Sequence, residues 1–282
     1  MTSGVARAAV RPLDVVAISL DFGNTLVRID RASTAAVLAD TARVVRERGI
    51  AADEGGFLRA WAEERDRQFR EELPHGREVD LRERVVRVLA RQRGLAPPPE
   101  AEHWDDPAAH GLVEPAEVEV AIEAYGGAFV SRMAPVDDAT LVIEQLAAAG
   151  FSLAVLSNWP LAETIERYVE VRGWLPHLRA VVVSQRVGAI KPQRAIFDAT
   201  RQRLGAPAER ILHVGDDWAA DVIGARRAGW RAAYLRDRQG DTPLPTSRPP
   251  DETAPTTERA DLVIAELAEL PPLVRRWPGA GG

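Results

Sequence analysis

A carboxylate stands where a buried strand is expected to end. The apolar run from Val15 to Leu20 is typical of a strand in the middle of a parallel sheet, and Asp21 follows it directly. Gly23 and its neighbours then turn the chain away. Because open α/β sheets bind ligands outside the carboxyl ends of their strands, Asp21 is placed where chemistry can occur.

A second acidic stretch follows another predicted strand and carries Asp216, Asp217 and Asp221. Carboxylates that converge at neighbouring strand ends repel one another and raise their own pKa values unless a cation lies between them. The chain has no cysteine and its five histidines are scattered, so we predict a hard cation, Mg²⁺. Its expected ligands are Asp21, the carbonyl of Gly23, Asp216, and Asp217 or Asp221; the choice between the last two stays open.

Two rare residue types occur in the same stretches. Of the 36 basic residues only Lys191 is a lysine, and the chain has two asparagines, Asn24 and Asn158. A compact ammonium cannot be exchanged for a planar guanidinium where space beside an anion is tight. We therefore assign all three residues to the site. His213, which lies inside a predicted strand, is interpreted as a packed core residue.

Four stretches in order resemble the motifs of the haloacid dehalogenase-like (HAD) hydrolase superfamily. They are DFGNTL at Asp21, VLSNWP at Ser157, GAIKP at Lys191 and GDDWAAD from Gly215. The resemblance covers about 170 residues of core. It implies that Asp21 is a nucleophile that becomes transiently esterified, and that Ser157 and Lys191 bind the phosphoryl group. Candidate phosphate- or substrate-binding residues are Asn24, Thr25 and Asn158.

One position departs from the phosphatases of that superfamily. They carry a second aspartate two residues after the nucleophile, which protonates the leaving group, and this chain has Gly23 there. A general acid is typically worth about 10²- to 10⁴-fold in rate. The departure leaves three hypotheses.

The first hypothesis is an enzyme, a Mg²⁺-dependent phosphatase that acts on a small phosphorylated metabolite through an aspartyl-phosphate. The second is a dehalogenase-like hydrolase that attacks carbon without a metal, because a halide leaves without a proton. The third is a non-catalytic member that binds a ligand or a protein. We favour the phosphatase, because the acidic stretch after Gly215 has no purpose in a metal-free enzyme.

The elements that position these residues alternate between strands and helices from Pro135 onward. This alternation predicts a Rossmann-like parallel sheet of the α/β class. About a hundred residues between the first strand and Pro135 have helical periodicity instead. We therefore expect an α/β catalytic core of residues 12–28 and 135–282 and an inserted all-α cap domain of residues 29–134. The stretch from Gly240 to Arg259 is expected to be a mobile surface loop, and a helix is expected before Arg275.

The composition and charge of the chain restrict its expected partners and cellular compartment. The net charge of −6 argues against nucleic acid as the main partner, because binding the phosphate backbone needs a basic surface. No apolar run is long enough to span a membrane, and no signal peptide is recognised at the amino terminus. With no cysteine in the chain, we expect a cytoplasmic protein whose partner is a small phosphorylated substrate.

Overall fold

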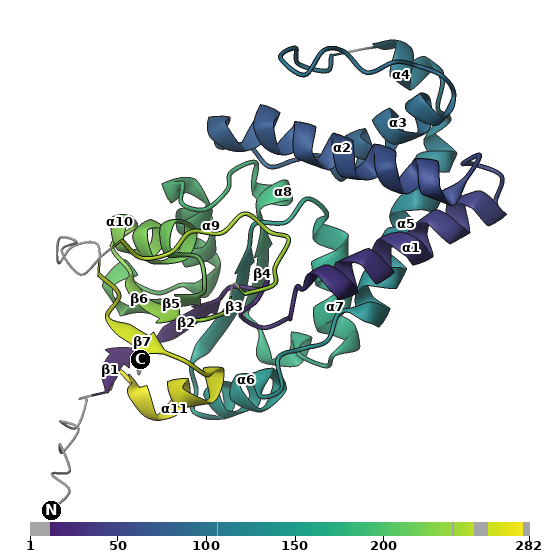
Figure 1. The fold of residues 1–282 in the computed structure, drawn as a ribbon. Helices are drawn as coiled ribbons and strands as arrows, with labels where there is room; N and C mark the ends of the chain where they lie inside the picture. The colour runs from purple at the N-terminus through teal and green to yellow at the C-terminus, as the bar shows by residue number, and fades with distance from the viewer. Residues whose placement is uncertain (1–11, 106, 239, 251–258, 279–282) are drawn as a thin grey trace, which may run out of the picture.

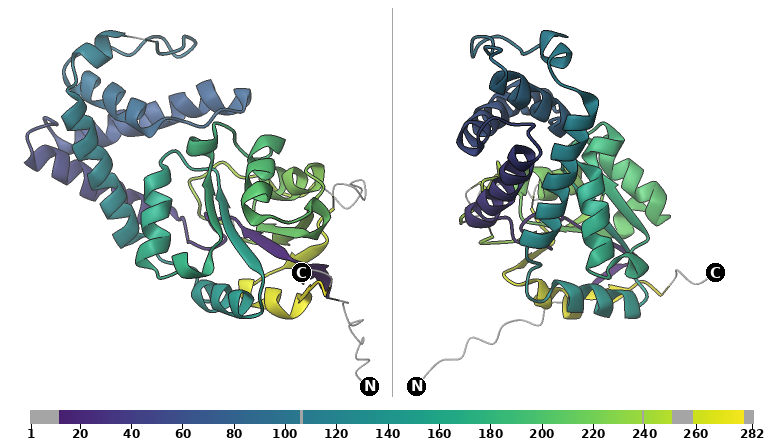
Figure 2. Two further views of the ribbon diagram at one scale, coloured as in Figure 1. Left: turned by 180° about the vertical axis from the view of Figure 1, so that it is seen from behind. Right: turned by 90° about the vertical axis from the view of Figure 1, so that its right-hand side faces the viewer.

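The computed structural model describes residues 12–105, 107–238, 240–250 and 259–278. Figure 1 shows a sheet flanked by helices and, beside it, a separate group of helices. The two views of Figure 2 show the same division from behind and from the side. The predicted fold class, α/β with a parallel sheet and a helical insertion, is confirmed.

The main sheet has six parallel strands in the order β4-β3-β2-β5-β6-β7. Their bounds are β2 Ala17–Leu20, β3 Ser152–Ser157, β4 Ala180–Val183, β5 Ile211–Gly215, β6 Arg231–Leu235 and β7 Leu262–Ile264. Leu20 at the end of β2 lies level with Val155 in β3 and with Val214 in β5. Residues that follow these three strands therefore meet at one edge of the sheet.

Helices cover both faces of this sheet. On one face lie α9 (Arg194–Leu204) and α10 (Gly224–Arg227), and on the other lie α6 (Ala139–Ala148) and α7 (Ala162–Val171). Alternate residues of β2 belong to the two cores, with Ala17 in one and Ile18 in the other. A strand buried on both faces needs an apolar run rather than alternation, as its sequence has.

The helical region, a name used below for residues 31–132, is inserted between β2 and β3. Its helices are α1 (Arg31–Glu47), α2 (Glu54–Glu72), α3 (Leu81–Gln92), α4 (Pro107–Gly111) and α5 (Pro115–Arg132), with a 3-10 turn, η1, at Leu73–His75. Three of the helices begin after an aspartate, Asp30, Asp53 or Asp80, whose carboxylate accepts a backbone N–H of the first turn. Such N-caps fix where each helix starts.

The two chain segments that join the helical region to the sheet lie side by side. Val27 and Pro135 form an antiparallel bridge. The N–H of Arg28 donates to the carbonyl of Ala134 at 3.0 Å, and the N–H of Val136 donates to Leu26 at 2.9 Å. The chain therefore enters and leaves the helical region through one paired ribbon, and α5 also packs against α7 of the core.

Three local predictions need correction. The first predicted strand is interrupted at Val16, and its amino-terminal part, β1 (Leu13–Val15), pairs with β8 (Val274–Arg276) in a separate two-stranded sheet. The predicted helix before Arg275 is reduced to a 3-10 turn, η6 (Leu267–Glu269), and one turn of helix, α11 (Leu270–Leu273). The Pro271-Pro272 pair at its centre lacks the N–H groups that a longer helix needs.

The other corrections concern short elements. The helix that the strand–helix alternation predicts after β5 begins as a π-helix, η4 (Trp218–Ile223), before α10. Short α8 (Ser184–Val187), η2 (Leu175–His177) and η3 (Ala208–Arg210) complete the described elements. The loop predicted from Gly240 to Arg259 lies in part, at residues 251–258, outside the described residues, as does most of the amino-terminal segment before Leu13.

Candidate active site

Asp21 and Lys191 form the centre of the site. The ammonium of Lys191 donates to Asp21 Oδ1 at 2.5 Å and to Asp221 Oδ1 at 2.6 Å, and it lies 3.3 Å from the carbonyl oxygen of Leu156. Only 4% of Lys191 is exposed. Burial disfavours its charge, but the two carboxylates outweigh burial and raise the pKa of Lys191, so it is an ammonium at neutral pH.

Asp221 holds this ammonium in place. Besides Lys191, its carboxylate contacts His213 Nε2 at 3.0 Å and accepts the backbone N–H of Asp217 at 2.9 Å. Burial opposes ionisation, yet Lys191 and His213 lower the pKa of Asp221 below its usual value. The side chain folds back against Gly215, where an added Cβ would lie 2.1 Å from Asp221 Oδ2. Only glycine fits at that position.

His213 is a packed core residue, as predicted, because it lies against the rings of Phe197 and Trp230, and it also contacts Asp221. It is buried, its Nδ1 lies 3.1 Å from Ser19 Oγ, and burial lowers its pKa. A neutral imidazole that faces an ionised Asp221 must carry its proton on Nε2, so it donates to that carboxylate. In the sequence, His213 is the one titratable residue of an otherwise apolar strand, and it lies 8 residues before Asp221.

The structure distinguishes between the two aspartates that the sequence left as alternatives. Asp217 is the N-cap of η4: its carboxylate accepts the N–H of Ala220 at 2.9 Å and of Ser247 at 3.0 Å. Asp21, Asp216 and Asp221 are instead brought together, each with a carboxylate oxygen within 4.8 Å of the others. Asp217 therefore lies at the rim of the site with its carboxylate occupied.

The group fits a hard cation. Three carboxylates and one ammonium leave excess negative charge, and burial, followed by repulsion from Asp21 and Asp221, raises the pKa of Asp216. Burial also raises the pKa of Asp21, against the attraction of Lys191. Because Asp221 already contacts Lys191, His213 and the N–H of Asp217, Asp21 and Asp216 are the carboxylates that could hold a hard cation, and Gly23 lines the same cavity.

The remaining predicted site residues take different positions. Ser157 is buried at the end of β3 and lines the cavity in front of Asp21. The amide of Asn158 is bound to the backbone of Lys191 at both ends, at 2.7 Å and 3.0 Å, so it positions that residue. Asn24, at a positive φ of 55°, accepts the N–H of Ile29 and donates to Thr242. Thr25 is fully buried and is not among the residues that line the cavity.

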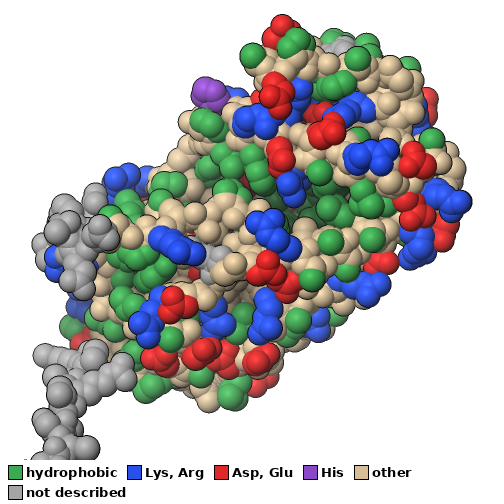
Figure 3. All heavy atoms as spheres, viewed as in Figure 1, with side chains coloured by type: hydrophobic (Ala, Val, Ile, Leu, Met, Phe, Trp, Pro, Cys, Tyr) green, Lys and Arg blue, Asp and Glu red, His purple; other side chains and the backbone are tan. Residues whose placement is uncertain are grey.

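The carboxylates open into a cavity of about 200 Å³ between the sheet edge and the helical region. Figure 3 shows a hollow there whose walls are mostly hydrophobic. Its apolar walls come from both sides: the helical region contributes Val37, Leu38, Trp61, Phe69, Tyr125 and Phe129, and the sheet side contributes Trp159 and Ile190. A ligand in this cavity would have a polar end at Asp21 and an apolar surrounding elsewhere.

Residues Asp241–Ser247, called here the crossing segment, form another wall that the sequence did not predict. Its ends are bound on two sides: the N–H of Arg31 donates to the carbonyl of Asp241 at 3.0 Å, and Ser247 Oγ lies 2.5 Å from Asp217 Oδ1. Between them Leu244 lies beside Gly23 and lines the cavity. The composition of the segment indicated a loop but could not indicate that it covers the site.

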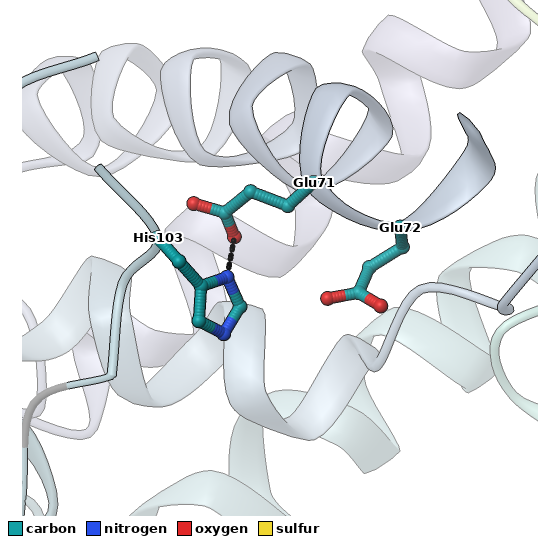
Figure 4. A group of neighbouring side chains, drawn as sticks. All are labelled: Glu71, Glu72 and His103. Carbon is teal, nitrogen blue, oxygen red and sulfur yellow. Dashed lines mark ion pairs between the residues drawn. The ribbon is translucent and has the colours of Figure 1, made fainter. Parts of the chain in front are cut away.

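A second acidic group lies in the helical region, and Figure 4 shows Glu71 and Glu72 near His103. His103 Nδ1 is 3.4 Å from Glu71 Oε2, which also accepts Arg87 Nη1 at 3.0 Å. Glu72 pairs with Arg77. Because arginines already compensate both carboxylates, this group is an ion-pair network of the fold and not a cation site.

The order of the four motifs and their convergence at one sheet edge can be compared with known proteins. A family model described as haloacid dehalogenase-like hydrolase matches residues 15–229, more than half of the chain. The chain belongs to this family. The HAD model thus spans Asp21, Ser157, Lys191 and Asp221, and the recognition made from the four motifs is confirmed.

A HAD phosphatase is among the curated relatives. Ribulose-1,5-bisphosphate 5-phosphatase of Halopiger xanaduensis is 31% identical over 153 residues, which cover 54% of this chain and 62% of the relative. The match therefore spans less than two thirds of that protein.

Solved HAD structures show the same fold over more of the chain. The 2-haloacid dehalogenase from Pseudomonas syringae pv. Tomato DC3000 has a TM-score of 0.61 at 18% identity, with 92% of this chain and 97% of that chain covered. The magnesium-bound HAD-hydrolase YfnB from Bacillus subtilis has a TM-score of 0.55 at 18% identity, with 91% and 97% covered. Within the described residues, no helix has the length and apolar character needed to cross a membrane.

Proposed function

We propose that this HAD-family member is a Mg²⁺-dependent phosphatase of small phosphorylated metabolites. The observation that carries the proposal is the convergence of Asp21, Asp216 and Asp221 with Lys191 at the cavity between the sheet edge and the helical region. A phosphoryl group needs cationic neutralisation and an in-line nucleophile, and this arrangement offers both.

In the proposed reaction an oxygen of Asp21 attacks phosphorus and forms an aspartyl-phosphate, while the bond from phosphorus to the leaving oxygen breaks. Lys191 stays beside Asp21 and neutralises charge on the phosphoryl oxygens, and Ser157 donates a hydrogen bond to them. Water then attacks phosphorus and releases phosphate and the free carboxylate. The released alcohol takes its proton from water or from the substrate, because Gly23 supplies none.

Asp21 and Asp216, with the Gly23 carbonyl, would hold the metal. When bound, Mg²⁺ supplies positive charge that stabilises the phosphoryl oxygens in the transition state. Asp221 acts through Lys191, and Asp217 through the start of η4. The ribulose-1,5-bisphosphate 5-phosphatase and magnesium-bound YfnB among the similar proteins support this assignment.

We further propose that residues 29–134 act as a cap over the core of residues 12–28 and 135–282. The cavity is bounded by both parts, so closer approach of the cap would reduce the access of water to Asp21. On the side away from the linkers, Ser184 Oγ donates to Glu78 Oε2 at 2.5 Å and Gln193 Nε2 donates to the carbonyl of Gly76 at 2.9 Å. These two contacts would break when the cap opens.

A second candidate function is carbon–halogen hydrolysis, and one contact favours it. Leu244 Cδ1 lies 3.3 Å from the position of a Cβ on Gly23, so an apolar group stands where a phosphatase carries its general acid. A halide leaves without a proton and tolerates this environment. The dehalogenase from Pseudomonas syringae shares the fold but, at 18% identity, does not decide the activity.

A substrate screen with and without Mg²⁺ tests the proposal. Purified protein is assayed on aryl and alkyl phosphates and on 2-haloacids, with the Asp21→Asn variant as the control for contaminating phosphatases. Mg²⁺-dependent release of phosphate that Asp21→Asn lacks is the expected result. Metal-independent halide release would establish the second candidate, and absence of both activities with retained ligand binding would establish a non-catalytic role.

A further inference from the structure

Arg84 is a buried arginine on α3 that faces the active-site cavity. It is 5% exposed, and it lines the same cavity as Asp21, with Arg84 coming from the helical region and Asp21 from the sheet edge. Its Nε donates to Gln68 Oε1 at 2.9 Å. Within the described part of the chain, neither of its terminal nitrogens donates a hydrogen bond, and Nη2 is fully buried without a partner.

Two other buried arginines of the helical region have hydrogen-bond acceptors for their terminal nitrogens. Arg87, one turn further along α3 and 4% exposed, donates to Glu71 Oε2 and to the carbonyl of Trp104. Arg67 donates to three backbone carbonyls, those of residues 98, 99 and 102. Buried arginines here are thus satisfied as a rule, and Arg84 is the exception that faces the cavity.

Aromatic stacking does not supply the hydrogen-bond acceptors that the terminal nitrogens of Arg84 lack. The Arg84 guanidinium carbon lies 5.5 Å from the ring centre of Trp61 and 6.0 Å from that of Phe69. Stacking engages the face of a guanidinium, whereas its N–H groups point outward in the plane and still need acceptors. The rings flank Arg84, which lines the cavity, and they leave the N–H groups of its terminal nitrogens without acceptors.

Among the described residues, no ion pair or hydrogen bond joins a carboxylate to Arg84, although the charges of Glu78 and Asp66 favour its charged form. Glu78 lines the same cavity, but its carboxylate accepts from Ser184 Oγ and from the N–H of Val79. Burial lowers the pKa of Arg84 to about 10, with Tyr125, Arg65, Glu78 and Asp66 also acting on it, and it remains charged at neutral pH.

We propose that Arg84 binds a second anionic group of the substrate, a carboxylate, at the end of the molecule away from the scissile phosphate. This inference rests on the proposed phosphatase function and names its substrate class. A carboxylate matches the planar geometry of a guanidinium. It would supply hydrogen-bond acceptors for the terminal N–H groups of Arg84, which have none among the described residues. The rings between the two charged ends favour an apolar, preferably aromatic body over a sugar.

The test measures the preference of the enzyme for a substrate that carries a carboxylate. This preference ratio is kcat/KM for 4-carboxyphenyl phosphate divided by kcat/KM for phenyl phosphate, both measured with Mg²⁺. The ratio in the wild type should exceed that in Arg84→Met by about 10- to 100-fold, the usual worth of a hydrogen bond to a charged group. Because the same two substrates are compared in each protein, their different leaving groups cancel.

Arg87→Met is the matched control, since it removes an equally buried guanidinium from the same helix. It should lower the melting temperature because it breaks two hydrogen bonds, yet leave the preference ratio at the wild-type value. Arg84→Met should leave the melting temperature unchanged or raised, because it removes a poorly satisfied buried charge. Should Arg84→Met fail to fold, Arg84→Gln, which keeps a donor toward Gln68, gives the same comparison.

A binding measurement separates this inference from the proposed function. Calorimetry compares 4-(phosphonomethyl)benzoate with benzylphosphonate, neither of which can be hydrolysed, in the wild type and Arg84→Met. If no phosphate is turned over but the carboxylate still tightens binding in an Arg84-dependent way, the phosphatase function fails and the subsite stands. Equal preference ratios, or equal carboxylate effects on binding, in wild type and Arg84→Met would overturn the subsite.

Discussion

Replacing Gly23 by aspartate tests whether the site lacks only a general acid. A side chain at this position starts 3.3 Å from Leu244 Cδ1 and 3.7 Å from Ile29 Cγ1. The φ of Gly23 is not in the left-handed region, so an aspartate there meets no backbone strain. The one tight neighbour is the far end of a flexible leucine. We therefore expect Gly23→Asp to fold, with a small displacement of Leu244.

The expected gain follows from the leaving group. A positioned acid is worth about 10²- to 10⁴-fold when the leaving group is a poor alkoxide, and little when it is a nitrophenolate that needs no proton. Gly23→Asp should therefore raise kcat/KM for an alkyl phosphate by at least about 10²-fold more than that for 4-nitrophenyl phosphate. Combining it with Leu244→Ala, which opens the contact, should increase the gain.

The assay is phosphate release from both substrates with saturating Mg²⁺, with Leu244→Ala alone as the control for the extra space. A change in the control that equals the change in Gly23→Asp would mean that space, and not the acid, was limiting. An equal response of alkyl and aryl phosphates to Gly23→Asp, with metal bound, would refute the assignment of position 23 as that of the missing acid.

Three further predictions concern the same site. Asp21→Asn should abolish turnover with an unchanged circular dichroism spectrum, because an amide is nearly isosteric but cannot attack; retained metal-dependent activity would contradict the nucleophile assignment. Lys191→Arg should lower kcat by at least about 10²-fold, because a guanidinium is too large for a site in which one nitrogen lies within 2.6 Å of Asp21 and Asp221; near-normal kinetics would show that the lone lysine is replaceable. The cap should open by rotation about residues 27–32 and 131–136, which spin labels placed on α2 and α9 would report as a distance distribution that narrows with a phosphate analogue; a single unchanged distance would exclude the motion.

Much of the site could be predicted from the sequence because its residues follow strands. Asp21 and Ser157 each come directly after a buried apolar run, and parallel strands of one sheet end at one edge. The order of the motifs and the single lysine then identified the remaining chemistry. These signals are local in the chain, and a local pattern of burial is what a sequence records.

The direction of individual side chains was decided by the tertiary structure. Asp217 and Asp221 are both acidic residues near a helix start, and only the fold turns one into an N-cap and brings the other back over Gly215 to Lys191. Asn158 was expected to bind substrate, whereas the structure gives its amide to the Lys191 backbone.

Contacts between distant parts of the chain were also beyond the sequence. Leu244 reaches Gly23 across more than 200 residues, and Arg84 faces the cavity while Arg87, on the same helix, finds acceptors in the fold. Arg84 and Arg87 lie on the same side of α3, displaced along its axis, so they meet different neighbours, and the sequence shows two arginines with no mark to separate them. Which buried charge the fold satisfies, and which it leaves for a ligand, depends on packing that exists only once the chain has folded.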